Sequence, residues 1–431
     1  MNTTTFNQGL LRFLADSPTA FHAVQSLQST LQQAGFQVLS EKEIWNLQPG
    51  KGYVVCRNDS SIIAFIMGTA AIADSGIRMV GAHTDSPCLK LKPNPDKMTK
   101  GYYQLGVELY GGVLLHPWFD RDLSLAGRVH FQTAAAEVQS CCIDFKRPIA
   151  TIPSLAIHLD RTANETHSIN AQTDLPPLLM LCNQEQPKLQ DFLMEQIRQE
   201  HPALQPAEIL DYELFFYDTQ KPAILGLQQE FIASARLDNL LSCYTAAMGL
   251  LHSAQQESAA TRLIVCNDHE EVGSASTSGA MGTFLSDLIN RIAPDAQSRT
   301  RALQKSLFIS TDNAHGVHPN FVSKHDEQHG PILNQGPVIK LNANQRYATN
   351  SETSAYFRML CKQANVPVQT FVTRADMACG STIGPITATK LGIPTIDVGV
   401  PTFAMHSIRE LAGTTDAHAL YQALKKHFAH Q

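Results

Sequence analysis

The stretch IRMVGAHTD, residues 77–85, carries the pattern from which the fold can be inferred. A short apolar run bounded by polar residues is typical of a buried strand, and this one ends on a histidine and an aspartate. The same pattern returns as RLIVCNDHEE at 262–271, SLFISTD at 306–312 and PTIDVGVP at 394–401. Open α/β sheets keep their ligand sites beyond the strand ends. The pattern therefore predicts an α/β fold with a site at one edge of its sheet.

The pattern changes twice along the chain, which predicts an interrupted domain. Residues 1–91 alternate helix-like and strand-like runs, and this pattern returns over 233–431, beginning with the apolar-spaced helix at 237–254. Residues 92–232 instead show short β-type runs with glycine turns, followed by a polar stretch rich in Pro and Gln. We therefore expect an α/β domain, with a central mixed sheet flanked by helices, that is interrupted by a smaller β-rich domain.

Bulk composition excludes several classes of protein. With 431 residues, a hydrophobic share of 43% and a charged share of 17%, the chain has the composition of an ordinary globular enzyme. Its formal net charge of −6 gives no basic footprint for nucleic acid or for an anionic membrane. The start of the sequence lacks an apolar core of signal-peptide length, and no later run is long enough to span a bilayer. We therefore expect a cytoplasmic protein.

The nine cysteines indicate reduced thiols. Their number is odd, Cys141 and Cys142 are adjacent, and the sequence contains no CxxC pair. These thiols fit small buried hydrophobic side chains better than a thiolate zinc site. A metal site would therefore be built from nitrogen and oxygen ligands.

Acidic and histidine side chains at the strand ends have the chemistry of a divalent metal site. Asp85 could accept a hydrogen bond from the His83 imidazole, which would fix the tautomer that presents the other nitrogen to a metal. Glu270 and Glu271 are adjacent carboxylates that repel each other unless a cation or a proton resolves the repulsion. One can hold a metal while the other takes a proton from the attacking water. Taken singly, a satisfied polar histidine, a solvated acidic turn and, at Asp238, a helix N-cap are open alternatives.

Two histidines, three carboxylates and one further glutamate together match the composition of a two-metal site. Each ion would receive one histidine, one terminal carboxylate and a share of a bridging carboxylate, with the ions about 3.5–4 Å apart. Nitrogen and oxygen ligands suit Zn, with Mn or Co as alternatives. His315 and His318 are additional donors near Asp312 in the sequence. The candidate ligands are His83, Asp238, Glu271, Asp312 and His406, and Glu270 is unligated.

Distinctive motifs are spread over nearly the whole chain, including FLADSPTAFHAV (13–24), GAHTDSPCLKLKP (81–93), PWFDRDLSLAGRV (117–129), DHEEVGS (268–274), STDNAHGVHPN (310–320), CGSTIGP (379–385) and AMHSIRE (404–410). Together they resemble the M18 family of metallo-aminopeptidases, the aspartyl aminopeptidase group. The resemblance implies a hydrolase that removes the N-terminal residue of peptides, with a preference for acidic residues if Lys340 lines the pocket. It also implies a catalytic α/β domain with an inserted dimerisation domain, and assembly into a tetrahedral homododecamer.

The resemblance assigns roles to the candidate ligands. It implies that His83 and Asp312 are terminal ligands of one ion. Glu271 and His406 would be terminal ligands of the other ion, and Asp238 would bridge the two.

The same resemblance implies how water is activated. Glu270 would be the general base, and Asp85 would orient the neighbouring histidine. Related two-metal peptidases have a cis peptide bond after the bridging acid. We therefore expect a cis Asp238–Asn239 bond.

Four further residues match family positions that contact the substrate. His158 would reach the site of a neighbouring subunit and help to hold the oxyanion, with a metal ligand or a buried structural histidine as alternatives. Lys340, in VIKLN, would bind the side chain of an acidic N-terminal residue of the substrate. The alternative interpretation of Lys340 is a solvated lysine at a strand end. His315 and Tyr347 complete this set.

Two other functions would use part of these features. A deacylase or deacetylase would keep the two-metal site and change the bond that is cleaved, but the M18 motifs outside the ligand set argue against it. A catalytically silent shell would use the large assembly alone, and the presence of every ligand together with Glu270 argues against that.

Overall fold

The computed structural model describes residues 1–182 and 187–430, which divide into two compact units. Large mixed sheets and helices confirm the predicted α/β class. The first unit contains Met1–Asp85, Pro222–Met405 and Glu410–Gln431, and the second contains Ser86–Lys221 and His406–Arg409.

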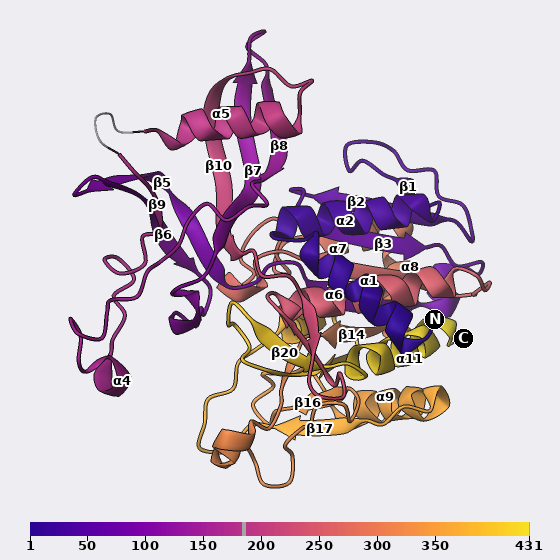
Figure 1. Cartoon of the computed structure of the whole chain (residues 1–431). Helices are drawn as coiled ribbons and strands as arrows, with labels where there is room; N and C mark the ends of the chain where they lie inside the picture. The colour runs from indigo at the N-terminus through magenta and orange to yellow at the C-terminus, as the bar shows by residue number, and fades with distance from the viewer. Residues whose placement is uncertain (183–186, 431) are drawn as a thin grey trace. The chain divides into compact units, whose positions relative to one another are not determined.

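A nine-stranded mixed sheet forms the centre of the first unit (Figure 1). Its middle contains β13 (Thr261–Asn267), β4 (Ile77–His83), β14 (Leu307–Thr311) and β18 (Thr395–Gly399), which pair in parallel. Parallel neighbours bring their carboxyl ends to one edge of a sheet, so the residues that follow these strands lie close together. The remaining strands are β1 (Gln37–Val38), β2 (Gly52–Arg57) and β3 (Ser61–Ile66) beyond β13, and β16 (Val338–Leu341) and β17 (Gln369–Val372) beyond β18.

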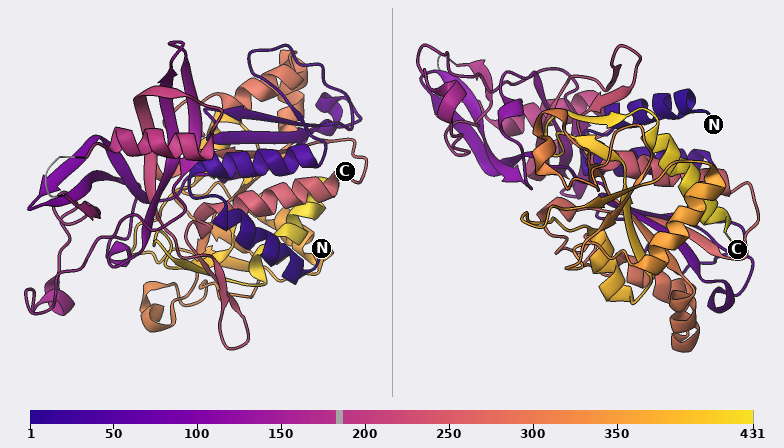
Figure 2. Two further views of the ribbon diagram at one scale, coloured as in Figure 1. Left: turned by 45° about the horizontal axis from the view of Figure 1, so that its top comes forward. Right: turned by 90° about the horizontal axis from the view of Figure 1, so that it is seen from below.

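Helices cover both faces of this sheet because its strands are apolar on both faces. In β3, Ile62 and Ala64 belong to a core on one face, whereas Ile63 and Phe65 belong to a core on the other. Successive side chains of a strand point to opposite faces, and each fully buried aliphatic side chain contributes about 1.5–3 kcal/mol. The helices that pack at the first core are α1 (Thr3–Ala15), α2 (Ala20–Gln33), α6 (Leu237–Ser253), α9 (Ser351–Ala364) and α11 (Asp416–Ala429) (Figure 2). Those that pack at the second core are α7 (Phe284–Ile292), α10 (Ile383–Leu391), α3 (Ile72–Ser75) and α8 (Ala296–Gln304).

A smaller five-stranded sheet in the first unit carries two further segments of interest. His315 is the last residue of one of its strands, and His406 lies in the loop between two others. The strands in spatial order are β11 (Ala223–Leu225), β12 (Phe231–Ser234), β20 (Glu410–Gly413), β19 (Pro401–Phe403) and β15 (Ala314–His315).

The second unit is built on a six-stranded antiparallel sheet. Helix α5 (Leu189–Glu200) packs on it through Leu193 and Ile197, which belong to the apolar core of this unit (Figure 1). Two short elements, η1 (His116–Trp118) and α4 (Ala163–Thr166), lie in its connections. The strands in spatial order are β8 (Val138–Asp144), β7 (Leu123–Thr133), β10 (Pro206–Asp218), β5 (Cys88–Thr99), β6 (Tyr102–Tyr110) and β9 (Leu178–Leu181).

The breaks between the units lie earlier than the changes in sequence pattern at residues 92 and 232. Strand β5 pairs with β6 from Cys88 onward, so the chain has joined the second sheet before residue 92. Strand β11 pairs with β12, so the chain is back in the first unit before residue 232. Sheet pairing, which the pattern of residue types does not reveal, therefore sets the observed boundaries.

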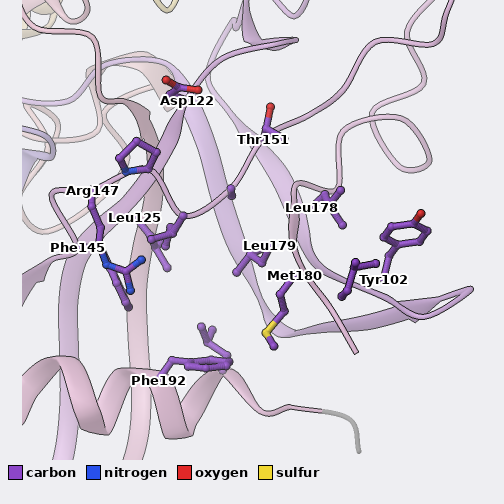
Figure 3. Close-up of a pocket in the computed structure, with 15 residues that line it drawn as sticks. Tyr102, Asp122, Leu125, Phe145, Arg147, Thr151, Leu178, Leu179, Met180 and Phe192 are labelled. Carbon is purple, nitrogen blue, oxygen red and sulfur yellow. The ribbon is translucent and has the colours of Figure 1, made fainter. Parts of the chain in front are cut away.

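An apolar pocket of about 720 Å³ lies within the second unit. Leu125, Leu179 and Phe192 line it, and Asp122 and Thr151 supply polar atoms (Figure 3). None of the nine cysteines, all of which lie in the described ranges, is assigned to a disulfide bond. Among the described residues, no helix is both long and apolar enough to cross a membrane.

Candidate active site

The carboxyl ends of three parallel strands gather the acidic and histidine side chains. His83 is the last residue of β4, and its register partner in β13 is Asn267. Glu270 and Glu271 follow β13 in the short 3-10 helix η2 (Glu270–Val272), and Asp312 directly follows β14. Segments far apart in sequence therefore meet around His83.

The imidazole of His83 is buried, with three carboxylates around its Nε2 atom. Nε2 lies 3.4 Å from Asp238 Oδ1, 3.7 Å from Asp312 Oδ1 and 3.9 Å from Glu270 Oε2. On the other side of the ring, Nδ1 donates to the carbonyl oxygen of Asp85 at 3.1 Å. A carbonyl oxygen only accepts, so the proton of the neutral ring lies on Nδ1 and the lone pair on Nε2.

This arrangement fits a divalent cation. A lone pair that faces three carboxylates is repulsive unless a proton or a cation lies between them. Within the described part of the chain, His83 Nε2 has no hydrogen-bond partner. Ligand atoms of His83, Asp238 and Asp312 lie within 4.8 Å of one another, and so do those of His83, Glu270 and Glu271. One nitrogen among carboxylate oxygens is a donor set that suits Zn.

Asp238 lies at a break in the first turn of α6. The backbone angles of Asp238 and Asn239 are not helical, and the peptide bond between them is cis, which confirms that prediction. The Asp238 N–H donates to Glu410 Oε2 at 2.9 Å, and Asn239 Nδ2 donates to the Thr311 carbonyl at 2.8 Å. The residue that precedes the helix is Arg236, whose side chain makes no cap hydrogen bond, and the N-cap alternative for Asp238 stays open.

The carboxylate of Asp85 holds the turn that carries the two glutamates. Its Oδ1 accepts the N–H of Glu270 and its Oδ2 accepts the N–H of Glu271, each at 3.1 Å. Its Oδ1 also lies 3.3 Å from His83 Nδ1. Asp85 therefore orients the imidazole through both its carbonyl and its carboxylate, and it fixes η2 as well. The sequence did not indicate this second contact, because only the fold brings residues 85 and 270 together.

Burial and mutual repulsion favour the protonated forms of these groups. Burial, with the charges of nearby aspartates, raises the pKa of Glu270 to about 7, although His83 opposes the shift. Burial and the charge of Asp238 raise the pKa of Glu271 well above its ordinary value. Burial lowers the pKa of His83, but the charge of Glu270 and the neighbouring aspartate carboxylates raise it well above its usual value. A cation would compete with these protons because it supplies the same positive charge.

Lys340 is a buried cation next to Asp312. Its side chain is 2% exposed, and Nζ lies 3.4 Å from Asp312 Oδ2 and donates to the Asn313 carbonyl at 3.1 Å. Nζ also lies 5.1 Å from the centre of the Tyr347 ring. The alternative of a solvated lysine is therefore wrong. Lys340 links Asp312 to the aromatic wall formed by Tyr347.

Tyr347 and His315 line a cavity of about 270 Å³ within the first unit. Its charged lining residues are Lys324 and Arg374, and His318 and His325 also border it. No carboxylate is among the described residues that line it. An anionic group would therefore meet basic side chains here and no acidic one.

His158 and His406 both belong to the second unit. His158 is exposed in a turn of the single chain, so the alternative of a buried structural histidine is wrong. His406 has a φ of 68°, and its Nδ1 lies 3.0 Å from the Gly112 carbonyl oxygen. As in His83, this contact leaves the lone pair of the neutral ring on Nε2.

Two buried acids near the site escaped the sequence analysis. Glu410, 2% exposed, accepts the N–H of Asp238. Asp397, 0% exposed, is the acid within the apolar run PTIDVGVP. A carboxylate inside an apolar strand costs free energy unless it is hydrogen-bonded, so Asp397 was a signal that the sequence did contain.

Comparison with known protein sequences gives consistent matches. Residues 13–428 match the family described as Aminopeptidase I zinc metalloprotease (M18). A probable M18 family aminopeptidase 2 of Pseudomonas savastanoi pv. phaseolicola is 58% identical over 424 residues, which cover 98% of each chain. A protein of the same description from Azotobacter vinelandii is 56% identical over 422 residues, covering 98% of this chain and 97% of the other.

Solved structures share the fold over almost the whole chain. The match in the cryo-EM structure of the Ape4 and Nbr1 complex has a TM-score of 0.96 and 39% identity, and covers 99% of this chain and 86% of that one. The structure of the S. cerevisiae mApe1 dodecamer matches with a TM-score of 0.85 and 28% identity, and the match covers 98% of this chain and 96% of that one. An M18 aminopeptidase from Thermotoga maritima matches with a TM-score of 0.84 and 21% identity, and the match covers 99% of this chain and 96% of that one. At this low identity the match supports the fold alone.

Proposed function

Because the chain belongs to the M18 family of zinc metalloproteases and is a metallo-aminopeptidase, we propose that it cleaves the N-terminal residue of peptides with two divalent ions. The observation that carries the proposal is the buried His83 Nε2 atom, 3.4 Å from Asp238 and 3.7 Å from Asp312. We assign His83 and Asp312 to one ion, and Glu271 and His406 to the other. Asp238 would be a ligand of both ions. Zn suits this donor set, with Mn or Co as alternatives.

The residues around the proposed ions divide the remaining chemistry between them. When bound, the ions would supply the Lewis acidity that polarises the scissile carbonyl and acidifies the attacking water. Glu270 accepts the proton of that water and delivers it to the leaving amine. Its pKa of about 7 suits both transfers near neutral pH. Asp85 keeps Glu270 in place through the backbone N–H of the turn.

The cavity beside Tyr347 is proposed to take the side chain of the N-terminal residue, with a preference for Asp or Glu. Lys324 and the histidines of its lining support this preference, whereas Arg374 is already paired with Asp376. Lys340 is the proposed cation at the inner end, behind the Tyr347 ring. An ion on Asp312 would take over part of the charge that now pairs with Lys340. The ammonium would then be available to a substrate carboxylate.

Self-association is the remaining part of the proposal. The matched mApe1 structure is a dodecamer, and we propose a tetrahedral homododecamer built from dimers, with the second unit as the dimerisation domain. Leu155 and Leu159 support an interface, because they are 60% and 75% exposed in the single chain. His158, between them, would contact substrate in the site of a neighbouring subunit. We place this assembly in the cytoplasm, where the reducing conditions suit free thiols.

A panel of aminoacyl substrates, assayed on metal-loaded enzyme, tests the proposed reaction. N-terminal Asp, Glu, Leu and Ala peptides would be compared with N-acyl amino acids, the substrates of a deacylase. We expect release of the N-terminal residue, fastest for Asp and Glu. Hydrolysis of the acyl compounds in preference to peptides would overturn the proposal.

The variant Glu270→Gln tests the proton transfer in the same assay. It keeps the shape of the side chain and removes the base, so turnover should fall by roughly 10²–10⁴-fold with the bound metal unchanged. Glu352→Gln, at an exposed position in the first turn of α9, is the matched control and should behave as the unchanged enzyme. Near-normal turnover of Glu270→Gln, or loss of metal from it, would remove Glu270 from this role.

A further inference from the structure

Asp397 is a buried carboxylate that the proposed reaction does not use. It lies in β18, and its neighbours Ile396 and Val398 belong to the core that contains α6. Because side chains alternate along a strand, Asp397 faces the opposite side of the sheet. It is 0% exposed, so its charge has to be compensated by hydrogen bonds or by nearby cations.

The two carboxylate oxygens of Asp397 hold two different segments of the chain. Oδ2 accepts the backbone N–H of Ala348 at 2.7 Å, and Oδ1 accepts the hydroxyl of Thr382 at 2.5 Å. The backbone N–H of Asp397 donates to Thr349 Oγ1 at 3.0 Å. Asp397 thereby connects the segment after β16 with the segment before α10.

Those two segments form adjoining parts of the cavity wall. Tyr347 directly precedes Ala348, Cys379 lies three residues before Thr382, and both Tyr347 and Cys379 line the cavity. The Tyr347 hydroxyl and the Cys379 thiol also interact, since burial and this contact together raise the pKa of Tyr347. A change in either bond to Asp397 would therefore move a wall of the cavity.

The first turn of α10 approaches the Asp397 carboxylate closely. A Cβ atom added at Gly384, in the first turn of α10, would lie 2.3 Å from Asp397 Oδ1. The backbone of that turn thus closes directly over the carboxylate, at the helix end where a negative charge is favourable. Glycine is needed here for close approach and not for its backbone angles.

We propose that Asp397 is a positioning residue for substrate selection. Its carboxylate fixes the positions of Tyr347 and Cys379 and so the shape of the cavity that receives the N-terminal side chain. Asp397 acts through those two residues and touches neither the substrate nor the ions. This inference rests on the proposed function, in which the cavity binds that side chain.

The test compares four variants of the full-length, metal-loaded enzyme on Asp- and Leu-peptides. Asp397→Ala loses both bonds. Thr382→Val keeps the shape of the side chain but loses its bond to Asp397, together with the cap bond that Thr382 Oγ1 accepts from the Gly384 N–H. We expect KM to rise roughly 10- to 100-fold for Asp397→Ala and by less for Thr382→Val, with kcat and bound metal changing far less. Asp397→Asn should restore most of the loss, because its amide can accept from Ala348 and donate to the Thr382 hydroxyl. Asp416→Ala is the control, since Asp416 is a buried carboxylate that holds the backbone N–H groups of Asn334 and Gly336.

Each other outcome contradicts the inference in a distinct way. If KM rises as much for Asp397→Asn as for Asp397→Ala, the negative charge of Asp397 determines KM and its two hydrogen bonds do not. If Asp416→Ala raises KM equally, the effect is one of general stability. If Asp397→Ala does not fold, Thr382→Val gives the result, and an unchanged KM there overturns the proposal.

One more variant separates this inference from the proposed function on which it rests. Ala378→Trp fills the cavity from an exposed lining position. If it raises KM while Asp397→Ala does not, the positioning role fails and the pocket assignment stands. If Ala378→Trp leaves KM unchanged for every peptide, the pocket assignment fails, and the role of Asp397 fails with it.

Discussion

The two units depart from the usual distribution of side chains in opposite ways. The first unit buries charged and ionisable groups at the sheet edge, with His83, Asp238 and Lys340 only 1%, 3% and 2% exposed. The second unit exposes apolar groups instead, with Leu155 and Leu159 at 60% and 75%. Buried charges are costly unless they are compensated, and exposed apolar patches mark interaction surfaces. The difference fits the proposal that cations complete the first unit and that a partner subunit covers part of the second.

The largest expected effect comes from removing the acid at the centre of the buried group. Asp238→Ala should lose bound metal and with it nearly all peptidase activity, because a bridging carboxylate serves both ions. Elemental analysis and a peptide assay would measure the two losses. Asp16→Ala, at an exposed position after α1, is the control and should keep both. Two ions per chain in Asp238→Ala would mean that Asp238 is not the bridge.

The second prediction concerns the exposed segment of the second unit. His158→Ala should lower kcat/KM by roughly 10²–10³-fold, because a well-placed oxyanion donor contributes that much. Metal content and fold should be unaffected, since the residue lies in an exposed turn.

Mixing two inactive variants decides whether His158 acts across an interface. Glu270→Gln and His158→Ala subunits, allowed to exchange, would form mixed interfaces that bring an intact histidine to a site with an intact base. Activity should then recover in part. Proven exchange without recovery would assign His158 to its own subunit.

Replacing the buried Lys340 should have a smaller effect, on the preference for acidic N-terminal residues. Lys340→Leu should lower the preference for Asp- over Leu-peptides by roughly tenfold or more, because a hydrogen bond to a charged group is lost. The ratio of kcat/KM for the two peptides measures this preference. Lys340→Arg, which keeps the charge, should retain more of it. If the unchanged enzyme already favours Leu-peptides, the specificity proposal fails while the peptidase assignment stands.

The smallest effect is a release of protons when metal binds. The pKa of Glu270 is raised to about 7, and those of Glu271 and His83 are raised as well, so the metal-free site holds extra protons near neutral pH. Metal must displace them, so metal affinity should weaken as the pH falls. Calorimetry in buffers of different ionisation enthalpy would detect the protons. Heats that do not depend on the buffer would show that the site is already deprotonated.

Much of this architecture could be read from the sequence because strand ends are local features. His83, Glu270 and Asp312 each follow an apolar run, and parallel pairing brings such ends together. The cis bond after Asp238 was also predicted, from the family resemblance.

The missed features depend on contacts between distant segments. The unit boundaries follow from the pairing of β5 and β11, which have no distinctive composition. The Asp85 bonds to the η2 backbone join residues far apart in sequence. The burial of Lys340 follows from the position of the Tyr347 ring above it. Residue types alone do not define such contacts.

The most direct measurement of the central claim is a metal titration of the stripped enzyme. Chelator-treated protein would receive Zn in steps, with bound Zn per chain and hydrolysis of an Asp-peptide followed together. We predict that activity appears as the sites around His83 and Asp238 fill and reaches its maximum at two ions per chain. Full activity in the metal-free protein, or a maximum at a single ion, would contradict the two-metal account.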